Sequence, residues 1–214
     1  GEGTELRFPQ MKDAPYCIGW INVRGCVFAG ISVVGPTQGE CLGPTRSDRT
    51  YTHGLVIRNS SECKLFDVTV ERVVCQGINI ANATGLELRK VITIDTGRDG
   101  IFLRDSTDFV LDSCEAMNNG DDSIALWSCS EALVQNSSVI QRVKADELNF
   151  RMGCGIRLGS CRNVTVRDTW IGNTVKAGIH MLRDTYATPP GGECDSISVQ
   201  NVTFSAIGKY NGPL

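Results

Sequence analysis

The sequence predicts an all-β fold built from stacked repeats, and three observations support this prediction. A glycine followed by a hydrophobic, a variable and a hydrophobic residue recurs at intervals of 23, 23, 23, 32 and 23 residues, with serine replacing glycine once. Short stretches of alternating hydrophobic residues, typical of strands buried on one face, fill each interval. The 214-residue chain also holds 23 glycines and only four methionines, which suits a turn-rich β protein. The repeat positions are Gly54, Gly77, Gly100, Ser123, Gly155 and Gly178.

Each repeat is predicted to contain up to three short strands. The first follows the glycine position, at residues 55–57, 78–80, 101–103, 124–126, 156–158 and 179–181. The second follows a turn, at residues 64–66, 86–88, 110–111, 133–134 and 164–166. The third follows a second bend, at residues 68–70, 91–94 and 139–140. Residues 26–33 match 63–70 in pattern, and residues 197–199 close the series.

Strands of this length, stacked coil upon coil, predict a right-handed single-stranded parallel β-helix of about seven coils. At about 4.8 Å a coil, these would form a rod about 33 Å long. A leucine-rich repeat would need its own consensus, and a propeller blade would need about 40 residues or more. We expect one domain over residues 1–214, forming the core of a longer chain. Because open end coils have unpaired strand edges, we expect further coils or a homo-oligomer such as a trimer to cover them.

Three insertions interrupt the period. They fall in the segments 35–52, 145–153 and 184–195, of which the first and third are rich in glycine and proline. The first two lead into a glycine strand and the third follows one, so all three can wall the same face of the solenoid. Loops that grow on one face usually mark the binding side.

The composition limits the partners and the compartment. A net charge of −3 without a Lys/Arg cluster argues against nucleic acid, and no apolar run reaches the length of about 18 residues that a membrane helix needs. Ten cysteines without a C-x-x-C pair argue against zinc. Together with five Asn-x-Ser/Thr sequons, they favour an extracellular or virion-surface location. The alternative is that this fold places Asn and Cys at turns and in the core in any compartment.

Two pairs of residues are expected to stack on neighbouring coils. Asn59 and Asn82 follow the glycine strand at the same position and should form a short asparagine ladder. Cys129 and Cys161 also share a position, with a Cα separation near 5 Å that would permit a disulfide. The repeat leaves both the bonded and the reduced pair open.

An acidic cluster is predicted where the turn enters the glycine strand. The residue before each repeat position is Asp99 on one coil and Asp122 on the next, and Asp121 stands beside Asp122. Stacked carboxylates repel each other and raise at least one pKa. Such a cluster suggests acid–base catalysis or cation binding. The alternative is an Asp-rich turn that caps backbone amides.

Other side chains on the same strand face suit a glycan. Phe102 and Trp127 are predicted to face solvent as platforms for sugar rings. Arg104 and Arg157 could hold a carboxylate or sulfate by paired hydrogen bonds. The alternative is that loops cover the two aromatic residues and leave them as core.

Three motifs give a more specific resemblance. The segments 98–100 (Arg-Asp-Gly), 119–125 (Asn-Gly-Asp-Asp-Ser-Ile-Ala) and 153–160 (Gly-Cys-Gly-Ile-Arg-Leu-Gly-Ser) resemble, in order and coil spacing, the motifs of family 28 glycoside hydrolases. These are the polygalacturonases and their relatives, with a pectin-lyase-like fold that phage tailspike depolymerases also have. The resemblance implies that Asp121 is the general acid and that Asp99 and Asp122 activate water for inversion. Two groups of carboxyls about 6.5–9.5 Å apart fit that mechanism.

The chain departs from this family at two motifs. Cys154 stands where the family has the His of G-H-G, and 180–182 reads His-Met-Leu where it has R-I-K. The resemblance therefore implies an acidic or branched polysaccharide other than plain polygalacturonate, with Arg157 or His180 replacing the missing basic residues. No cofactor is expected for a hydrolase. Two alternatives are a polysaccharide lyase, in which the Asp cluster would bind Ca²⁺, and a non-catalytic glycan-binding rod such as a tailspike or adhesin segment.

Overall fold

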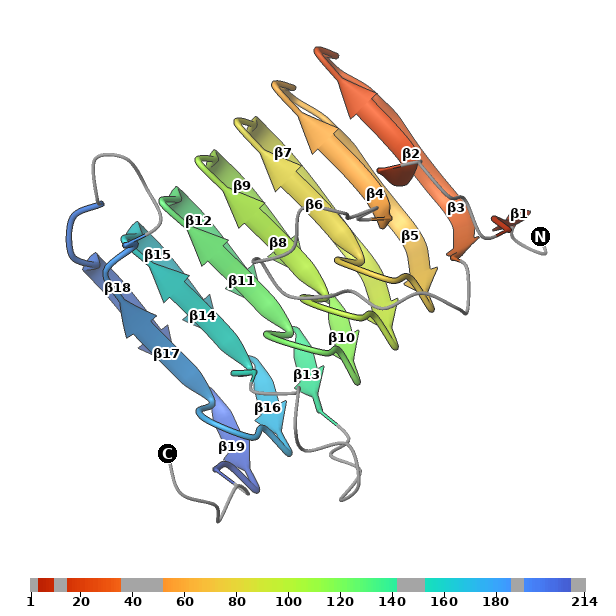
Figure 1. Ribbon diagram of the computed structural model, residues 1–214. Helices are drawn as coiled ribbons and strands as arrows, with labels where there is room; N and C mark the ends of the chain where they lie inside the picture. Colours follow the sequence, from red (N-terminus) through yellow and green to blue (C-terminus); the bar gives the residue numbers. More distant parts are fainter. Residues whose placement is uncertain (1–3, 10–14, 36–51, 142–152, 186–190, 209–214) are drawn as a thin grey trace.

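The computed structural model describes residues 4–9, 15–35, 52–141, 153–185 and 191–208, which form a stack of parallel strands (Figure 1). Two sheets of parallel strands run the length of the stack, one with seven strands and one with twelve. This arrangement confirms the predicted all-β parallel β-helix and its number of coils.

The seven-stranded sheet contains the glycine strands, one for each coil. Its members are β2 (Tyr16–Ile21), β4 (His53–Arg58), β6 (Ile78–Ala81), β8 (Ile101–Arg104), β11 (Ile124–Trp127), β14 (Ile156–Gly159) and β17 (Ile179–Leu182). Neighbouring strands pair with the predicted shift of one repeat, as in Ile78 with Ile101, Ile101 with Ile124 and Ile124 with Ile156. The residues that the repeat aligns therefore stack on one another.

The twelve-stranded sheet closes the other sides of each coil. In the early coils it consists of β1 (Thr4–Arg7), β3 (Val27–Val34), β5 (Lys64–Glu71) and the long β7 (Thr84–Ile94). Beyond β7 each long strand divides into two, which gives the predicted three strands a coil. These are β9 (Thr107–Asp112), β10 (Glu115–Met117), β12 (Ser130–Gln135), β13 (Ser138–Ile140), β15 (Arg162–Arg167), β16 (Trp170–Gly172), β18 (Asp195–Gln200) and β19 (Thr203–Ser205).

The corners of the coils use left-handed backbone conformations. Single residues with positive φ recur at the same corner of successive coils, and most are Asn, Asp, Ser or Gly. Asn and Asp tolerate this conformation because their short polar side chains bond locally. All five sequon asparagines lie at such corners: Asn59, Asn82, Asn136, Asn163 and Asn201. The corners of the fold therefore give each of these asparagines a structural role, which the alternative interpretation also expected.

The predicted asparagine ladder is present, and the cysteine pair is reduced. Asn82 Nδ2 donates to Asn59 Oδ1 at 3.3 Å. Cys129 and Cys161 are free thiols, as are all cysteines in the described part of the chain. Their Sγ atoms each donate to backbone carbonyls, that of Trp127 for Cys129 and that of Leu126 for Cys161, both at 3.3 Å.

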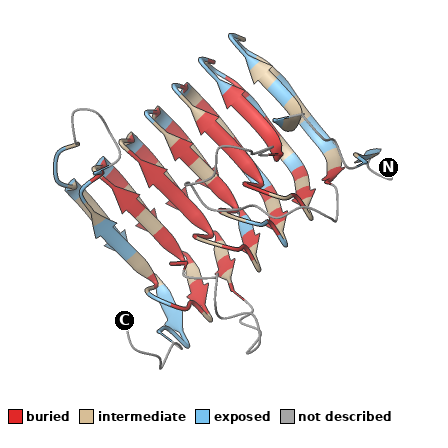
Figure 2. Ribbon diagram, viewed as in Figure 1, coloured by how far each residue is buried: buried red, intermediate tan, exposed pale blue. Residues whose placement is uncertain are grey.

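The core fills the interior of the central coils, and both ends of the stack are open (Figure 2). Isoleucine, leucine and valine from both sheets form one continuous cluster. Within the described part of the chain the end coils are less covered: Val27 is 60% exposed at one end, and Met181 and Phe204 are 50% and 48% exposed at the other. Association at these ends stays a prediction. None of the described residues forms a helix that could cross a membrane.

Candidate functional site

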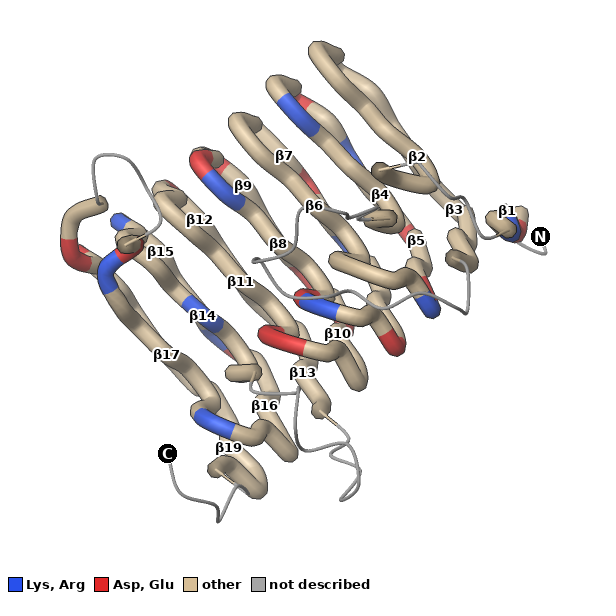
Figure 3. The backbone as a smooth tube through the Cα atoms, viewed as in Figure 1, with Lys and Arg blue, Asp and Glu red and all other residues tan. Residues whose placement is uncertain are grey.

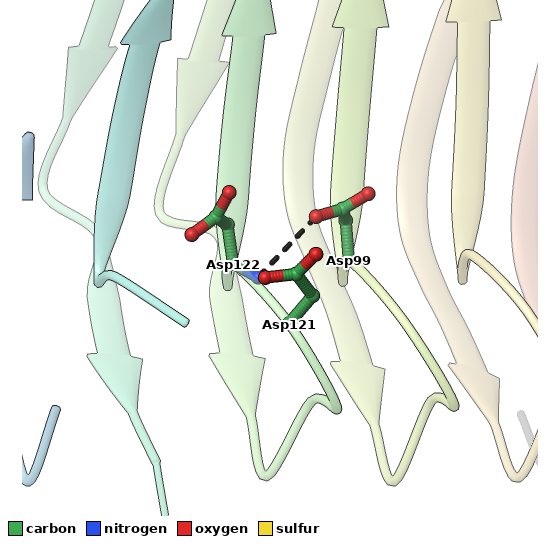
Figure 4. A group of neighbouring side chains, drawn as sticks. All are labelled: Asp99, Asp121 and Asp122. Carbon is green, nitrogen blue, oxygen red and sulfur yellow. Dashed lines mark hydrogen bonds between the residues drawn. The ribbon is translucent and has the colours of Figure 1, made fainter. Parts of the chain in front are cut away.

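Three aspartates meet where the coil turns into β8 and β11 (Figure 4). The turn before β8 holds Asp99, and the turn before β11 holds Asp121 and Asp122. One oxygen from each carboxylate lies within 4.8 Å of the others. The backbone fixes this stacking, because Gly77 N donates to Asp99 O at 3.0 Å and Gly100 N donates to Asp122 O at 3.1 Å. The sequence prediction that these three side chains cluster is therefore confirmed.

Asp99 is a buried carboxylate held on two sides. Its Oδ2 accepts a hydrogen bond of 2.8 Å from Gln76 Nε2, and its Oδ1 accepts one of 3.3 Å from Asp122 N. Burial, together with the charges of Asp121 and Asp122, raises the pKa of Asp99 to about 7. Arg98 and Gln76 oppose this shift. Asp99 therefore retains its proton into the neutral range.

Asp122 is buried and bound by a guanidinium. Its Oδ1 accepts hydrogen bonds from Cys154 N at 2.7 Å and Arg157 Nη2 at 3.0 Å, while Oδ2 pairs with Arg157 Nε. Burial raises the pKa of Asp122 to about 6, and the Asp121 charge contributes, although Arg157 opposes both. Arg157 thus balances the charge of one carboxylate in the cluster.

Asp121 is the member of the cluster that reaches solvent. Its side chain is 36% exposed, and Arg98 Nη2 lies 3.7 Å from its Oδ2. Its backbone is held firmly, because Gln141 Nε2 donates to Asp121 O at 2.7 Å. A Cβ on Gly153 would lie 1.8 Å from the same carbonyl oxygen, so the next coil packs directly on this turn. Asp121 is the carboxylate that a bound substrate would meet first.

The cluster is compact at its nearest oxygens. One oxygen from each of the three carboxylates lies within 4.8 Å of the others, because parallel in-register coils stack equivalent residues only about 4.8 Å apart. The separation of about 6.5–9.5 Å between two groups of carboxyls, which suits inversion, stays a prediction. Oxygen ligands this close could also hold a divalent cation, which prefers carboxylates.

Arg157 is not free to bind a substrate anion, since its guanidinium pairs with Asp122 and its side chain is 15% exposed. His180 on β17 is exposed and stands opposite Arg157 in the register of the neighbouring strand β14. Burial, Arg157 and Lys176 lower the pKa of His180, in that order. Figure 3 shows the acidic turn before β11 with basic residues before β8, on β14 and before β17. Basic groups therefore lie on both sides of the aspartates.

Arg104, Phe102 and Trp127 form a second group further along the same strands. The Arg104 guanidinium carbon lies 6.0 Å from the Phe102 ring centre and 5.7 Å from that of Trp127. Trp127 is only 7% exposed, so the prediction that it faces solvent is wrong. Its ring lies against Gly159 of the next coil, where a Cβ would be 2.3 Å from the ring. Phe102 is half-buried.

The third insertion folds back onto this group. The buried Asp184 carboxylate accepts a hydrogen bond of 3.1 Å from Ser128 Oγ and lies 3.4 Å from Arg104 Nη2. Asp184 N donates to Ser160 Oγ at 2.6 Å. The described start of this insertion therefore lies on the glycine-strand face, as predicted. The predicted first insertion lies almost wholly, and the second mostly, outside the described residues.

Cys154 stands where the motif that the sequence resembles has histidine, and a buried thiol cannot replace an imidazole chemically. It is fully buried, and burial together with the Asp122 charge raises the pKa of its thiol to about 11. Because the thiolate is the reactive form, Cys154 is inert as a nucleophile at neutral pH. Its contribution to the site is the backbone N–H that binds Asp122.

Sequence reasoning missed two buried polar residues of this face. Gln76 occupies the same stacked position as Asp99 one coil earlier, so the repeat alignment carried a signal for it. Asp184 lies in an insertion with no equivalent on other coils, and only the folded chain reveals its contact with Arg104.

Comparisons with known proteins agree with this architecture. A model described as the right-handed beta helix region matches residues 53–190. No curated protein matches the chain significantly.

Several solved structures resemble the chain closely in fold and weakly in sequence. The enzymatically active domain of tailspike protein 2 of bacteriophage CBA120 has a TM-score of 0.65 at 13% identity, covering 95% of this chain and 35% of that chain. The A-module of Azotobacter vinelandii mannuronan C-5 epimerase AlgE4 has a TM-score of 0.60 at 12% identity, covering 89% and 63%. The chain thus spans about a third of the tailspike domain and less than two thirds of the epimerase module. At these identities the likeness shows the fold.

Proposed function

The chain belongs to the right-handed beta helix family, whose model matches more than half of its residues, and we propose that it acts on polysaccharides as an inverting glycoside hydrolase. One observation carries the proposal: three carboxylates share a site in which Asp121 is exposed while Asp99 and Asp122 are buried with raised pKa values. Such a cluster holds a proton in the mildly acidic range, where a glycosidase needs both an acid and a base.

The exposure of each carboxylate suggests its role. Asp121, at the surface, protonates the leaving glycosidic oxygen. Asp99 and Asp122 orient an attacking water and take its proton. Because Asp99 and Asp122 lie close together, their protons titrate as a pair rather than residue by residue.

The hydrogen bonds that hold the two buried carboxylates, Asp99 and Asp122, favour water over a carboxylate as the nucleophile. Both oxygens of Asp122 are held by Arg157 and Cys154, and both oxygens of Asp99 accept hydrogen bonds. A carboxylate fixed in this way can accept a proton from water, but it cannot advance to the anomeric carbon. A single displacement by water inverts the configuration.

The charges around the cluster suggest an acidic polysaccharide. Lys176 and His180 are exposed before and on β17, and Arg98 lies beside Asp121. These positions replace the R-I-K residues of the family that the sequence resembles. Arg104, Phe102 and His180 remain our candidates for substrate contacts, whereas Arg157 and the buried Trp127 act by supporting neighbouring groups.

A Ca²⁺-dependent lyase is the second candidate, and the 4.8 Å cluster of carboxylate oxygens is the observation that favours it. In that case the same aspartates would bind the cation, and a nearby basic residue would remove the sugar proton.

The proposed setting is the cell exterior or a virion surface, and the same fold in a bacteriophage tailspike protein supports it. The exposed apolar residues Met181 and Phe204 at the open end favour association with further coils or with other copies, such as a trimer.

The test is an NMR time course with a panel of acidic and capsular polysaccharides, with and without EDTA. The proteins are the natural chain, Asp121→Asn and the matched control Asp105→Asn, an exposed corner residue of the preceding coil. New reducing ends of inverted configuration, lost in Asp121→Asn alone and indifferent to EDTA, would establish the hydrolase. An unsaturated product that EDTA abolishes would establish the lyase. Binding without any product would establish a glycan-binding rod.

A further inference from the structure

We propose that Gln76 is a positioning residue which, oriented by Asn79, holds the Asp99 carboxylate in its working direction. This inference rests on the proposed function, because it concerns the same acid–base cluster. Neither residue belongs to the motifs that resemble family 28 glycoside hydrolases.

The need for a positioning residue follows from the crowding of the cluster. Asp99 faces the charges of Asp121 and Asp122, with Arg98 as the nearby cation. Repulsion between carboxylates favours rotation of Asp99 away from its neighbours. A donor on the opposite side is therefore needed to fix the plane of the carboxylate.

Gln76 supplies that donor from the preceding coil. Its Nε2 lies 2.8 Å from Asp99 Oδ2, and both residues are buried, at 5% and 3% exposure. Asp122 N binds the other oxygen. Asp99 is thus held by the preceding coil and by the following coil, and each of its two oxygens accepts a hydrogen bond from a different partner.

Asn79 decides which end of the Gln76 amide faces Asp99. An amide can present either its oxygen or its nitrogen, and an oxygen turned toward Asp99 would repel the carboxylate. Asn79 Nδ2 donates to Gln76 Oε1, which leaves Nε2 directed at Asp99. Asn79 is itself buried and lies three residues along the chain, on β6.

The result is a hydrogen-bonded chain across four coils. It runs from Asn79 through Gln76 to Asp99, then through Asp122 N to Asp122, and ends at Arg157 and Cys154 N. An interaction network of this kind fixes side chains more firmly than isolated pairs. The Gln76 hydrogen bond opposes the burial that raises the pKa of Asp99, and so it supports the charged form, which accepts a proton from water.

The experiment compares Gln76→Met, Asn79→Leu and a matched control, Ser137→Ala. Methionine keeps the length of glutamine without the donor. Ser137 is buried and bridges Gln135 O and Cys114 N on another corner, so its variant also removes buried hydrogen bonds. Steady-state kinetics and a crystal structure are determined for each protein.

For Gln76→Met we expect kcat to fall about 10- to 100-fold with KM within about twofold, because Gln76 lies behind the substrate face. We expect a smaller fall of kcat for Asn79→Leu, and natural kinetics for Ser137→Ala. In the Gln76→Met crystal structure the Asp99 carboxylate should have rotated.

An unmoved Asp99 in that structure would overturn the proposal whether or not any substrate is cleaved. A rise of KM with unchanged kcat would also overturn it. If the natural chain cleaves no glycan, the proposed function fails, and the orientation of Asp99 still decides the positioning role. If Gln76→Met does not fold, the orientation of Asp99 in Asn79→Leu is the deciding measurement.

Discussion

Arg157 and Asp122 lie 35 residues apart in the chain and form a charged pair. Both Nε and Nη2 of the guanidinium contact the carboxylate. The pair joins β14 to the turn before β11 at the centre of the carboxylate cluster. Three carboxylates within 4.8 Å would otherwise place three like charges together. The pair is therefore what lets Asp122 ionise beside its neighbours.

Breaking this pair should destabilise the fold. Arg157→Met leaves a buried carboxylate without its cation, which typically costs about 3–5 kcal/mol. The loss should be full at pH 7.5 and smaller at pH 4.5, because Asp122 is protonated there. Urea unfolding at both pH values measures it, with Arg58→Met, an exposed arginine, as control. An equal loss at both pH values would mean that the contribution of Arg157 is packing and not charge.

Stability should fall as the pH rises through the acidic range. The folded-state pKa of Asp99 is about 7 and that of Asp122 about 6, both above the ordinary value of 3.8. Between about pH 4 and pH 7 the folded chain holds more protons than the unfolded chain, so deprotonation disfavours folding. The two carboxyls therefore add to the unfolding free energy below about pH 4, and this extra stability is fully lost above about pH 7.

Asp99→Asn should remove most of this slope. The measurement is the unfolding free energy in urea at steps from pH 4 to pH 8 for both proteins, with a change on the order of a few kcal/mol in the natural chain. A slope in Asp99→Asn equal to that of the natural chain would contradict the raised pKa of Asp99.

Gly153 should resist even a methyl group. An alanine Cβ there would lie 1.8 Å from Asp121 O, so the coil must move and carry Asp121 with it. We expect Gly153→Ala to lose about 1–3 kcal/mol of unfolding free energy and most of its activity. Gly192→Ala is the matched control, because no atom lies within 4 Å of its added Cβ. Thermal unfolding and the NMR assay check both; equal behaviour of the two variants would disprove the close contact.

The two partners of the Arg104–Asp184 pair should respond unequally to substitution. Arg104 is 31% exposed and can turn to water, whereas the Asp184 side chain is 1% exposed. Arg104→Met removes this guanidinium from beside a buried carboxylate and should cost about 3 kcal/mol. Asp184→Asn keeps the Ser128 hydrogen bond and should cost about 1 kcal/mol. Urea unfolding gives both values, and the reverse order would refute the described burial.

The buried thiols should be unreactive in the folded protein. Burial raises the pKa of Cys114, Cys129 and Cys161 to about 12 each, so almost no thiolate forms at pH 8. Alkylation with iodoacetamide, followed by peptide mass mapping, should modify these residues only after unfolding in urea. Rapid labelling of the folded chain, or a peptide in which Cys129 and Cys161 are linked, would contradict this expectation.

Much of the fold could be predicted because the repeat constrains every coil in the same way. The interval between glycines fixed the pairing of Ile101 with Ile124, and therefore the stacking of Asp99 beside Asp122 and of Asn82 on Asn59. A register shift by one residue would turn the core outward, so only one alignment satisfies all coils. Gln76 could have been found by the same alignment, since it occupies the position of Asp99 one coil earlier.

The burial and pairing of side chains could not be predicted in this way. Trp127 was expected to face solvent, and it is buried because Gly159 leaves room for its ring. Arg157 was expected to bind substrate, and it binds Asp122 instead. Asp184 belongs to an insertion outside the repeat, and only the return of that segment to the strand face brings it to Arg104.

The sequence alone determined the fold class, the register and the position of the three aspartates, because a periodic pattern of buried residues admits one stacking. The tertiary structure decided which charges neutralise each other and which carboxylate reaches solvent. Those properties depend on distances of a few ångströms between side chains from different coils, and electrostatic interactions in a buried site change steeply over such distances.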